Sequence, residues 1–190
     1  YKEKYYSELT FHYWFWKNML SSFKNEETWI GFCQKRRFWL QNKKKLKSED
    51  IKSQLLNLVP GEWSNYNAVI CEPISLVNPK LIKVFKKGWR NLIKDPSIIY
   101  NKKKHSIKLH FDMFHGYGKI DQAINVMKKK DREEFRSFIN ESTSFNPHIM
   151  FISKPRILNN WFSDVFTWLS DCEEIFGFEN LKGYESQRLY

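Results

Sequence analysis

Three short apolar runs limit the folds that are open to this chain. They read TWIGFC at residues 28–33, NAVICEP at 67–73 and NPHIMFIS at 146–153. Apolar runs this short, bounded by turn residues, are typical of buried β-strands, whereas helices need longer stretches. Because helical patterns separate the runs, the sequence predicts an α/β fold in which helices pack on a sheet.

Two of the expected helices, one before the first run and one after the last, have clear signals. The first is expected at residues 6–20, where Ser7 can cap the helix and Glu8 lies in its positive first turn. The clearest is expected at residues 154–176, which carry a broad apolar stripe that includes Trp161. We expect this stripe to face the sheet.

The middle of the chain is less regular. A helix is expected at residues 78–93, with Leu81, Ile82 and Phe85 facing inward. The segment IKLHFDMFHGYG at residues 107–118 alternates partly between apolar and polar residues, which indicates an extended strand. One or two short helices are expected in the charged segment that follows.

The composition is that of a folded protein with a strong positive charge. The chain has 190 residues, which fits a single domain, and 42% of them are hydrophobic. The formal net charge of +11 favours anionic partners, namely nucleic acid, phosphorylated metabolites or an acidic membrane surface. Because no nucleic-acid-binding motif is present, nucleic acid is the less favoured partner. The three cysteines form no Cys-x-x-Cys pair, and we expect three buried thiols rather than a zinc site.

Arg36 and Arg37 follow the first apolar run, in the segment WIGFCQKRRFW at residues 29–39. In an open α/β sheet, ligands bind beyond the carboxyl ends of the strands. Guanidinium groups match phosphate oxygens through paired hydrogen bonds. We therefore predict that both arginines bind substrate. The alternative is a solvated pair, or a pairing with Glu8 or Glu26.

The segment HFDMFHGYG places His110, Asp112 and His115 within six residues. On an extended strand, His110 and Asp112 would project to the same face. Such a group could hold a divalent metal, orient a hydroxyl group or act as a base. The alternative is a histidine with a structural partner beside a helix cap.

Polar residues that could contact a ligand also occur near the C-terminal end. His148 precedes the third apolar run, although the neighbouring Asn-Pro pair is also an ordinary turn signal. Gln187 and Arg188 lie in the final segment, YESQRLY. On their own these residues carry no functional prediction, and a turn is favoured at His148; only the resemblance to a known family implies that the three side chains bind substrate.

Taken in order, these motifs resemble a family of bacterial sugar transferases from capsule and O-antigen gene clusters, long labelled a domain of unknown function. YYSELTFHYWFWKN resembles the family's opening YYSELTGLYWIWKN, and WIGFCQKRRFW resembles YIGLCHYRRYF. The segments LHFDMFHGYGKIDQAI, FNPHIMFIS and YESQRLY follow in the same order at compatible spacing. The resemblance covers nearly the whole chain.

The resemblance implies a GT-A-like glycosyltransferase, with an open sheet that has helices packed on both faces. Some members are similar to galactofuranosyltransferases. It implies a nucleotide-sugar donor such as a UDP-sugar, a glycan or lipid-linked acceptor, and a cytoplasmic location with peripheral association at the inner face of the membrane. Mn²⁺ or Mg²⁺ is the expected cofactor if one is used, although no clear Asp-x-Asp triplet occurs.

The resemblance also implies roles for particular residues. It places Glu8, Arg36, Arg37, His110, Asp112 and Arg188 at the site. We predict Asp112, His110 and Glu8 to be catalytic, with His115 beside them in contact with substrate. Asp112 is then expected within roughly 10 Å of one of the two arginines, about three residues of extended strand.

The chain departs from the family pattern in three places. The family's usual first strand is absent before YYSELT, and the chain ends at Tyr190, before the Ala-Glu-Arg glutamate that is a candidate base. Ile149 replaces the asparagine of the family's NMFI. We therefore expect residues 1–190 to be a single domain and a fragment of a longer transferase. Two alternatives stay open: a basic nucleic-acid-binding module, or a non-catalytic acceptor-binding domain of a larger enzyme.

Overall fold

The structure is a computed structural model that describes residues 2–41, 51–179, 181 and 190 of the chain. The described chain groups into two compact units, each assembled from separated segments. Unit 1 comprises Tyr1–Thr10, Glu72–Pro147 and Ser163–Tyr190. Unit 2 comprises Phe11–Cys71 and His148–Phe162.

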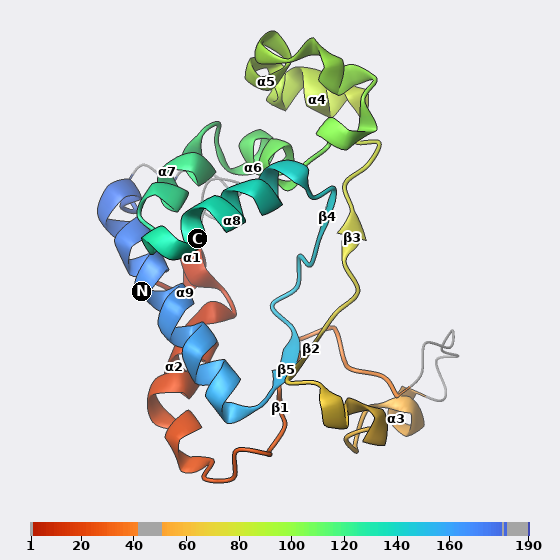
Figure 1. Cartoon of the computed structure of the whole chain (residues 1–190), viewed down its shortest axis with the longest axis vertical. Helices are drawn as coiled ribbons and strands as arrows, with labels where there is room; N and C mark the ends of the chain where they lie inside the picture. Colours follow the sequence, from red (N-terminus) through yellow and green to blue (C-terminus); the bar gives the residue numbers. More distant parts are fainter. Residues whose placement is uncertain (1, 42–50, 180, 182–189) are drawn as a thin grey trace. The chain divides into compact units, whose positions relative to one another are not determined.

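Unit 2 is built on a three-stranded sheet (Figure 1). Its strands, in spatial order, are β1 (Ile30–Gly31), β5 (Phe151–Ser153) and β2 (Ala68–Ile70). Both outer strands pair antiparallel with β5. Each of the three apolar runs contains one of these strands, so the predicted strands are confirmed. The mixed α/β class is confirmed too, whereas the larger open sheet is not found among the described strands.

Aromatic rings form much of the core of unit 2. Helix α2 (Leu9–Asn18) carries His12, whose buried ring lies 4.5 Å from that of Phe32 and 6.0 Å from that of Phe162, measured between centroids. Phe162 belongs to helix α9 (Pro155–Phe176) and is fully buried. Shorter helical turns complete the unit, namely η1 (Leu20–Ser22), α3 (Ile51–Gln54) and η3 (Gly61–Asn65).

Unit 1 is mainly helical. It contains one antiparallel pair of strands, β3 (Ile74–Ser75) and β4 (Ser144–Phe145). Its first helices are α1 (Glu3–Tyr6), α4 (Leu81–Lys87), α5 (Trp89–Lys94), η4 (Pro96–Ile99) and η5 (Lys102–Lys104). They are followed by α6 (Ile107–His115), α7 (Lys119–Asn125) and α8 (Lys129–Glu141), and the C-terminal part of α9 also belongs to this unit.

Helix α6 corrects the prediction of a strand at residues 107–118. Ser106 begins the helix, because its Oγ accepts a hydrogen bond from the backbone N–H of Leu109 at 3.3 Å. Leu109 and Met113 belong to a core cluster with residues of α4 and η4. Ile107 and Phe111 pack instead against a second cluster from α7 and α8. These two pairs, each four residues apart, are offset by two positions along α6, which explains the strand-like alternation.

Two expected helices also differ in detail. The first one breaks at Ser7, whose φ of 49° lies in the left-handed region, so Ser7 ends α1 and Glu8 lies in the turn before α2. The other begins at Leu81, and Val84 is its buried residue. Leu81, Ile82 and Phe85 are exposed, so the prediction that they face inward is wrong.

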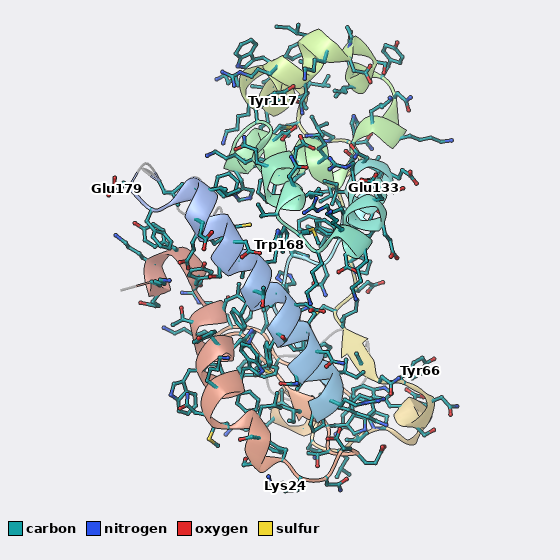
Figure 2. The ribbon with its side chains drawn as sticks, turned by 60° about the vertical axis from the view of Figure 1, so that its left-hand side comes forward. Lys24, Tyr66, Tyr117, Glu133, Trp168 and Glu179 are labelled. Atoms are coloured by element: carbon teal, nitrogen blue, oxygen red, sulfur yellow. The ribbon has the colours of Figure 1, made fainter. Side chains whose placement is uncertain are left out.

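The long helix α9 confirms the prediction for residues 154–176. Leu158, Phe162, Leu169 and Cys172 form its buried stripe. Trp161 contacts Phe151 of β5 at 4.8 Å between centroids but stays 39% exposed, so it lies at the margin of the core. Further along, Trp168 donates from Nε1 to the carbonyl oxygen of Ala123 in α7 at 2.6 Å (Figure 2). Among the helices described, none is long and apolar enough to cross a membrane.

Candidate functional site

An aromatic cavity in unit 2 lies next to the arginine pair. Its volume is about 290 Å³. It is lined by Trp29, Gly31, Cys33, Phe38, Trp39, Leu55, Leu56, Asn57, Leu58, Val59, Trp63 and Ile152. Such a mixture of aromatic walls with a few polar groups is typical of a small-molecule site.

The aromatic walls are held by contacts within the unit. The rings of Trp29 and Trp63 lie 5.7 Å apart between centroids, with an interplanar angle of 59°. Trp39 donates from Nε1 to the carbonyl oxygen of Phe32 at 2.9 Å, which fixes its indole. Gln41 donates from Nε2 to Oδ1 of Asn57 at 2.7 Å. The cavity therefore presents flat apolar faces, which suit a nucleobase or the apolar face of a sugar ring.

Arg36 and Arg37 are close in the chain to this cavity, although neither residue lines it. They occupy the turn between Cys33 and Phe38, two residues that line it. The turn is closed by the Arg37 backbone N–H, which donates to the Gln34 carbonyl oxygen at 3.1 Å, and Nη1 of Arg37 donates to Oε1 of Gln34 at 2.9 Å. Within the described part of the chain, the guanidinium of Arg36 forms no hydrogen bond or ion pair. Exposed cations beside an aromatic cavity can bind the phosphates of a ligand whose ring enters it.

His110 lines a separate cavity in unit 1. This cavity, also of about 290 Å³, is lined by residues of β3, the following segment at 76–80, α4 and α6. The ring of His110 lies 4.8 Å from that of Phe114, and the Lys83 ammonium lies 5.7 Å from the Phe114 centroid. Burial is the main cause that lowers the pKa of His110, and repulsion from His115 and Lys83 lowers it further. No described residue hydrogen-bonds the His110 ring, so this imidazole can accept a proton.

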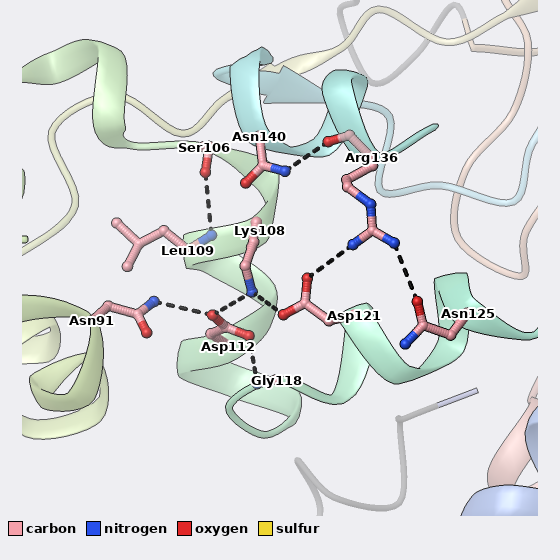
Figure 3. A network of polar contacts seen from close by, with 10 residues as sticks. All are labelled: Asn91, Ser106, Lys108, Leu109, Asp112, Gly118, Asp121, Asn125, Arg136 and Asn140. Atoms are coloured by element: carbon pink, nitrogen blue, oxygen red, sulfur yellow. Dashed lines mark hydrogen bonds and ion pairs between the residues drawn. The ribbon is translucent and has the colours of Figure 1, made fainter. Parts of the chain in front are cut away.

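Asp112 is held in a different way (Figure 3). Its side chain is buried, and Oδ2 accepts from the Lys108 ammonium at 3.0 Å and from Nδ2 of Asn91 at 3.2 Å. Its Oδ1 accepts from the backbone N–H of Gly118 at 3.0 Å. The Lys108 ammonium also lies 2.7 Å from Oδ2 of Asp121. Both oxygens of Asp112 are therefore committed to structural donors that connect α5, α6 and the start of α7.

The prediction that His110 and Asp112 share one face is wrong, because it assumed a strand. Residues two apart on a helix project about 200° apart, so the two side chains leave α6 on different sides. His115 contacts Phe111 at 4.8 Å between ring centroids. The predicted proximity of Asp112 to Arg36 or Arg37 stays a prediction, because Asp112 belongs to unit 1 and the arginines to unit 2.

The remaining predicted site residues are spread along the chain. Glu8 lies in the turn before α2 and is half-buried. His148 lies shortly before β5 and is also half-buried. Gln187 and Arg188 lie outside the described residues. Their roles stay predictions.

Sequence reasoning missed the proximity of Trp29 and Trp63 in the aromatic walls of the cavity in unit 2. Trp29 and Trp63 lie 34 positions apart, and nothing in the sequence pairs them. Cys33, expected to be buried, is exposed at this cavity, and all three cysteines are free thiols. The motif WIGFCQKRRFW, several of whose residues line the cavity, was the signal that pointed to the region.

The described residues do not fit a metal site. No three His, Cys, Asp or Glu side chains among them come close enough together to hold an ion. The use of Mn²⁺ or Mg²⁺ stays a prediction.

Comparisons with known proteins identify the fold and the family. The solved structure of the WbbM bifunctional glycosyltransferase in its apo form matches with a TM-score of 0.63 and 18% sequence identity. The match covers 99% of this chain and 32% of that one, so the chain spans about a third of its structural relative. A search of curated proteins finds no match. The model of the family described as "Domain of unknown function (DUF4422)" matches residues 1–190. The chain therefore belongs to the DUF4422 family.

Proposed function

We propose that this chain is a glycosyltransferase domain that moves a sugar from a nucleotide-sugar donor to a glycan acceptor. The likeness of its fold to part of a bifunctional glycosyltransferase, over 99% of its length, carries the proposal. The aromatic cavity beside Arg36 and Arg37 supports it, because a nucleotide sugar offers rings and a diphosphate together. A UDP-sugar is the donor to test first.

The chemistry is displacement at the anomeric carbon. The acceptor hydroxyl oxygen forms a bond to that carbon, the bond from the carbon to the diphosphate oxygen breaks, and the nucleoside diphosphate leaves with the electron pair. Arg36 and Arg37 stabilise the negative charge that develops on the departing diphosphate. Stabilisation of developing charge by fixed groups is usually the largest single contribution to catalysis. The proton of the acceptor hydroxyl passes to a base.

Of the two residues of α6 that were predicted to be catalytic, His110 rather than Asp112 has a side chain that can act as a base. Burial keeps the His110 imidazole neutral by lowering its pKa, and no described residue occupies its ring nitrogens. The oxygens of Asp112, by contrast, accept hydrogen bonds from Lys108, Asn91 and Gly118. His110→Gln should lower kcat strongly while leaving the affinity for the donor unchanged.

The finer assignments follow the family resemblance. We propose a lipid-linked or polysaccharide acceptor of the capsule or O-antigen type, transfer at the cytoplasmic face of the membrane, and galactofuranose as one sugar to include among the donors. The GT-A-like open sheet belongs to the same proposal. The similarity of fold supports the reaction class, and the choice of sugar depends on the experiment below.

The test is titration of the full-length protein with a panel of nucleotide sugars, followed by assays of transfer. We expect Arg36→Gln with Arg37→Gln to weaken binding of the preferred donor by roughly tenfold to a hundredfold, because two charged hydrogen-bond donors are lost. Lys35→Gln is the matched control, since Lys35 is an exposed cation in the same turn. Absence of binding to every nucleotide sugar, or an equal loss in Lys35→Gln, would contradict the proposal. Tight, salt-sensitive binding of random DNA in its place would favour the nucleic-acid alternative.

A further inference from the structure

Helices α4 and α5 present large apolar side chains to solvent. These helices lie in unit 1, at the top of the view in Figure 1, and meet at Gly88. The exposed apolar residues are Leu81, Ile82, Phe85, Trp89 and Ile93, which we call the α4–α5 patch. Single exposed apolar residues are common, but a cluster of five on two adjoining short helices marks an interaction surface.

The exposure of the patch is large. Ile82 is 69% exposed, Phe85 53%, Trp89 51% and Ile93 73%. In the same helices, Val84 and Gly88 are buried. Val84 packs with Leu109 and Met113 of α6, so α4 already uses a separate face for its own core. The patch is therefore not part of the packing that holds unit 1 together.

Positively charged residues alternate with those of the patch along the chain. The cations of this segment are Lys80, Lys83, Lys86, Lys87, Arg90 and Lys94. No acidic residue occurs between Glu72 and Asp95. Asp95 itself is ion-paired with Lys104, whose Nζ lies 3.1 Å from Oδ2 of Asp95. The segment thus combines exposed apolar side chains with cations and with almost no opposing charge.

We propose that the α4–α5 patch binds the surface of a membrane that contains anionic lipids. Apolar side chains flanked by lysines suit such a surface, because the apolar groups enter the acyl boundary while the cations meet the phosphates of the headgroups. Trp89 is a residue type that prefers the interface itself. The long lysine side chains can reach the headgroups while their methylene stems lie against the apolar layer.

The charge pattern distinguishes a membrane from other occupants. A second copy of this chain would bring the same cations against each other, which costs free energy. A protein partner would need an acidic rim that matches six cations, whereas an anionic bilayer offers negative charge in every direction. The inference does not depend on the proposed function, since it concerns binding and not transfer.

Co-sedimentation with vesicles tests the proposal. The full-length protein is mixed with vesicles of phosphatidylcholine alone, or of phosphatidylcholine and phosphatidylglycerol in equal amounts. We expect binding to the mixed vesicles to be at least about tenfold stronger, and to weaken as salt is added, because salt screens the cations. Ile82→Gln with Ile93→Gln should weaken this binding by about tenfold or more, because two apolar anchors are lost.

Matched variants separate the patch from general effects. Ile70→Gln with Ile175→Gln replaces two exposed isoleucines outside the patch and should leave binding unchanged. Lys80→Gln with Lys86→Gln should weaken binding on the order of tenfold, whereas Lys129→Gln with Lys130→Gln, on α8 of the same unit, should weaken it much less. This second set needs no change in the apolar residues, so it tests the proposal even if the isoleucine variants fold poorly.

Three outcomes would overturn the proposal. The first is wild-type protein that does not bind the mixed vesicles. The second is an equal loss of binding in the patch variants and their controls. The third is self-association without lipid, measured by sedimentation velocity, that Ile82→Gln with Ile93→Gln abolishes, since the patch would then join two copies of the chain.

Discussion

The Lys108 ammonium lies 3.0 Å from Oδ2 of Asp112, one turn further along α6. The Asp112 side chain is almost fully buried, whereas that of Lys108 is partly exposed. Burial alone would lower the pKa of Lys108, but its hydrogen bonds to Asp121 and Asp112 outweigh that effect and raise the pKa above its ordinary value. The lysine is thus charged in the folded protein, and its second contact, with Asp121, connects α6 to α7.

Asp112→Asn should lower the free energy of unfolding by about 2–4 kcal/mol. The change removes the buried charge that faces Lys108 and puts an amide where Oδ1 or Oδ2 accepted hydrogen bonds. Urea unfolding measures the loss. Asp121→Asn is the control and should cost less than about 1 kcal/mol, because Asp121 is more exposed. Unchanged stability of Asp112→Asn would mean that its structural role is minor and would favour a catalytic one.

His12 should make the stability of the protein fall in mild acid. Its Nδ1 is buried and has no hydrogen-bond partner among the described residues, and burial lowers its pKa from 6.5 to about 4. The unfolded chain therefore binds a proton at a higher pH than the folded chain does. The contribution of neutral His12 to the free energy of unfolding is fully present above pH 6.5. It decreases by about 3 kcal/mol in total as the pH falls from 6.5 to about 4.

Urea unfolding across this pH window checks the expectation. His12→Phe should flatten the decline, because a phenyl ring fits among the surrounding aromatic rings and does not titrate. His148→Asn is the control and should show the same decline of stability as the wild type. A decline that persists unchanged in His12→Phe would assign the acid sensitivity to other groups.

The positions of the strands could be predicted from the sequence, but their pairing in the sheet could not. The strands at Ile30, Val69 and Ile152 were visible because an apolar run of suitable length is a local property. Their pairing was not, since Ile152 lies opposite Val69 at a distance of more than eighty positions. The periodicity at α6 misled for a physical reason: Leu109 and Phe111 pack against different clusters, so burial on two sides imitated the alternation of a strand.

The candidate site was predictable only in part. The cation pair Arg36–Arg37 is contiguous in the chain, so its unusual position after an apolar run could be recognised. The aromatic wall of the cavity brings Trp29 to Trp63, and this proximity arises from tertiary structure alone. The hydrogen bonds that both oxygens of Asp112 accept could not be predicted either, because the donors Asn91 and Gly118 lie in other elements.

Trp63→Ala should weaken binding of the preferred nucleotide sugar by roughly tenfold if the aromatic cavity holds a ring of the donor. The ring of Trp63 lies beside that of Trp29 and lines the cavity. Tyr66→Ala is a close control, because Tyr66 (Figure 2) follows the same helical turn, is exposed and does not line the cavity. Calorimetric titration compares the two. If both variants bind as the wild type does, the donor lies elsewhere.

Phe162→Ala should cost much more stability than the neighbouring Trp161→Ala. Phe162 is completely buried on α9 and lies among the rings of Phe32, Phe151 and His12, so its removal leaves a cavity and should cost about 3–5 kcal/mol.

Trp161 is the larger side chain, and the sequence placed it in the stripe that was expected to face the sheet. It contacts Phe151 along one edge but stays 39% exposed, so its truncation should cost only about 1–2 kcal/mol. Urea unfolding of both variants gives the comparison. A cost of Trp161→Ala equal to that of Phe162→Ala would mean that Trp161 is covered in the intact protein, by a surface outside the described residues.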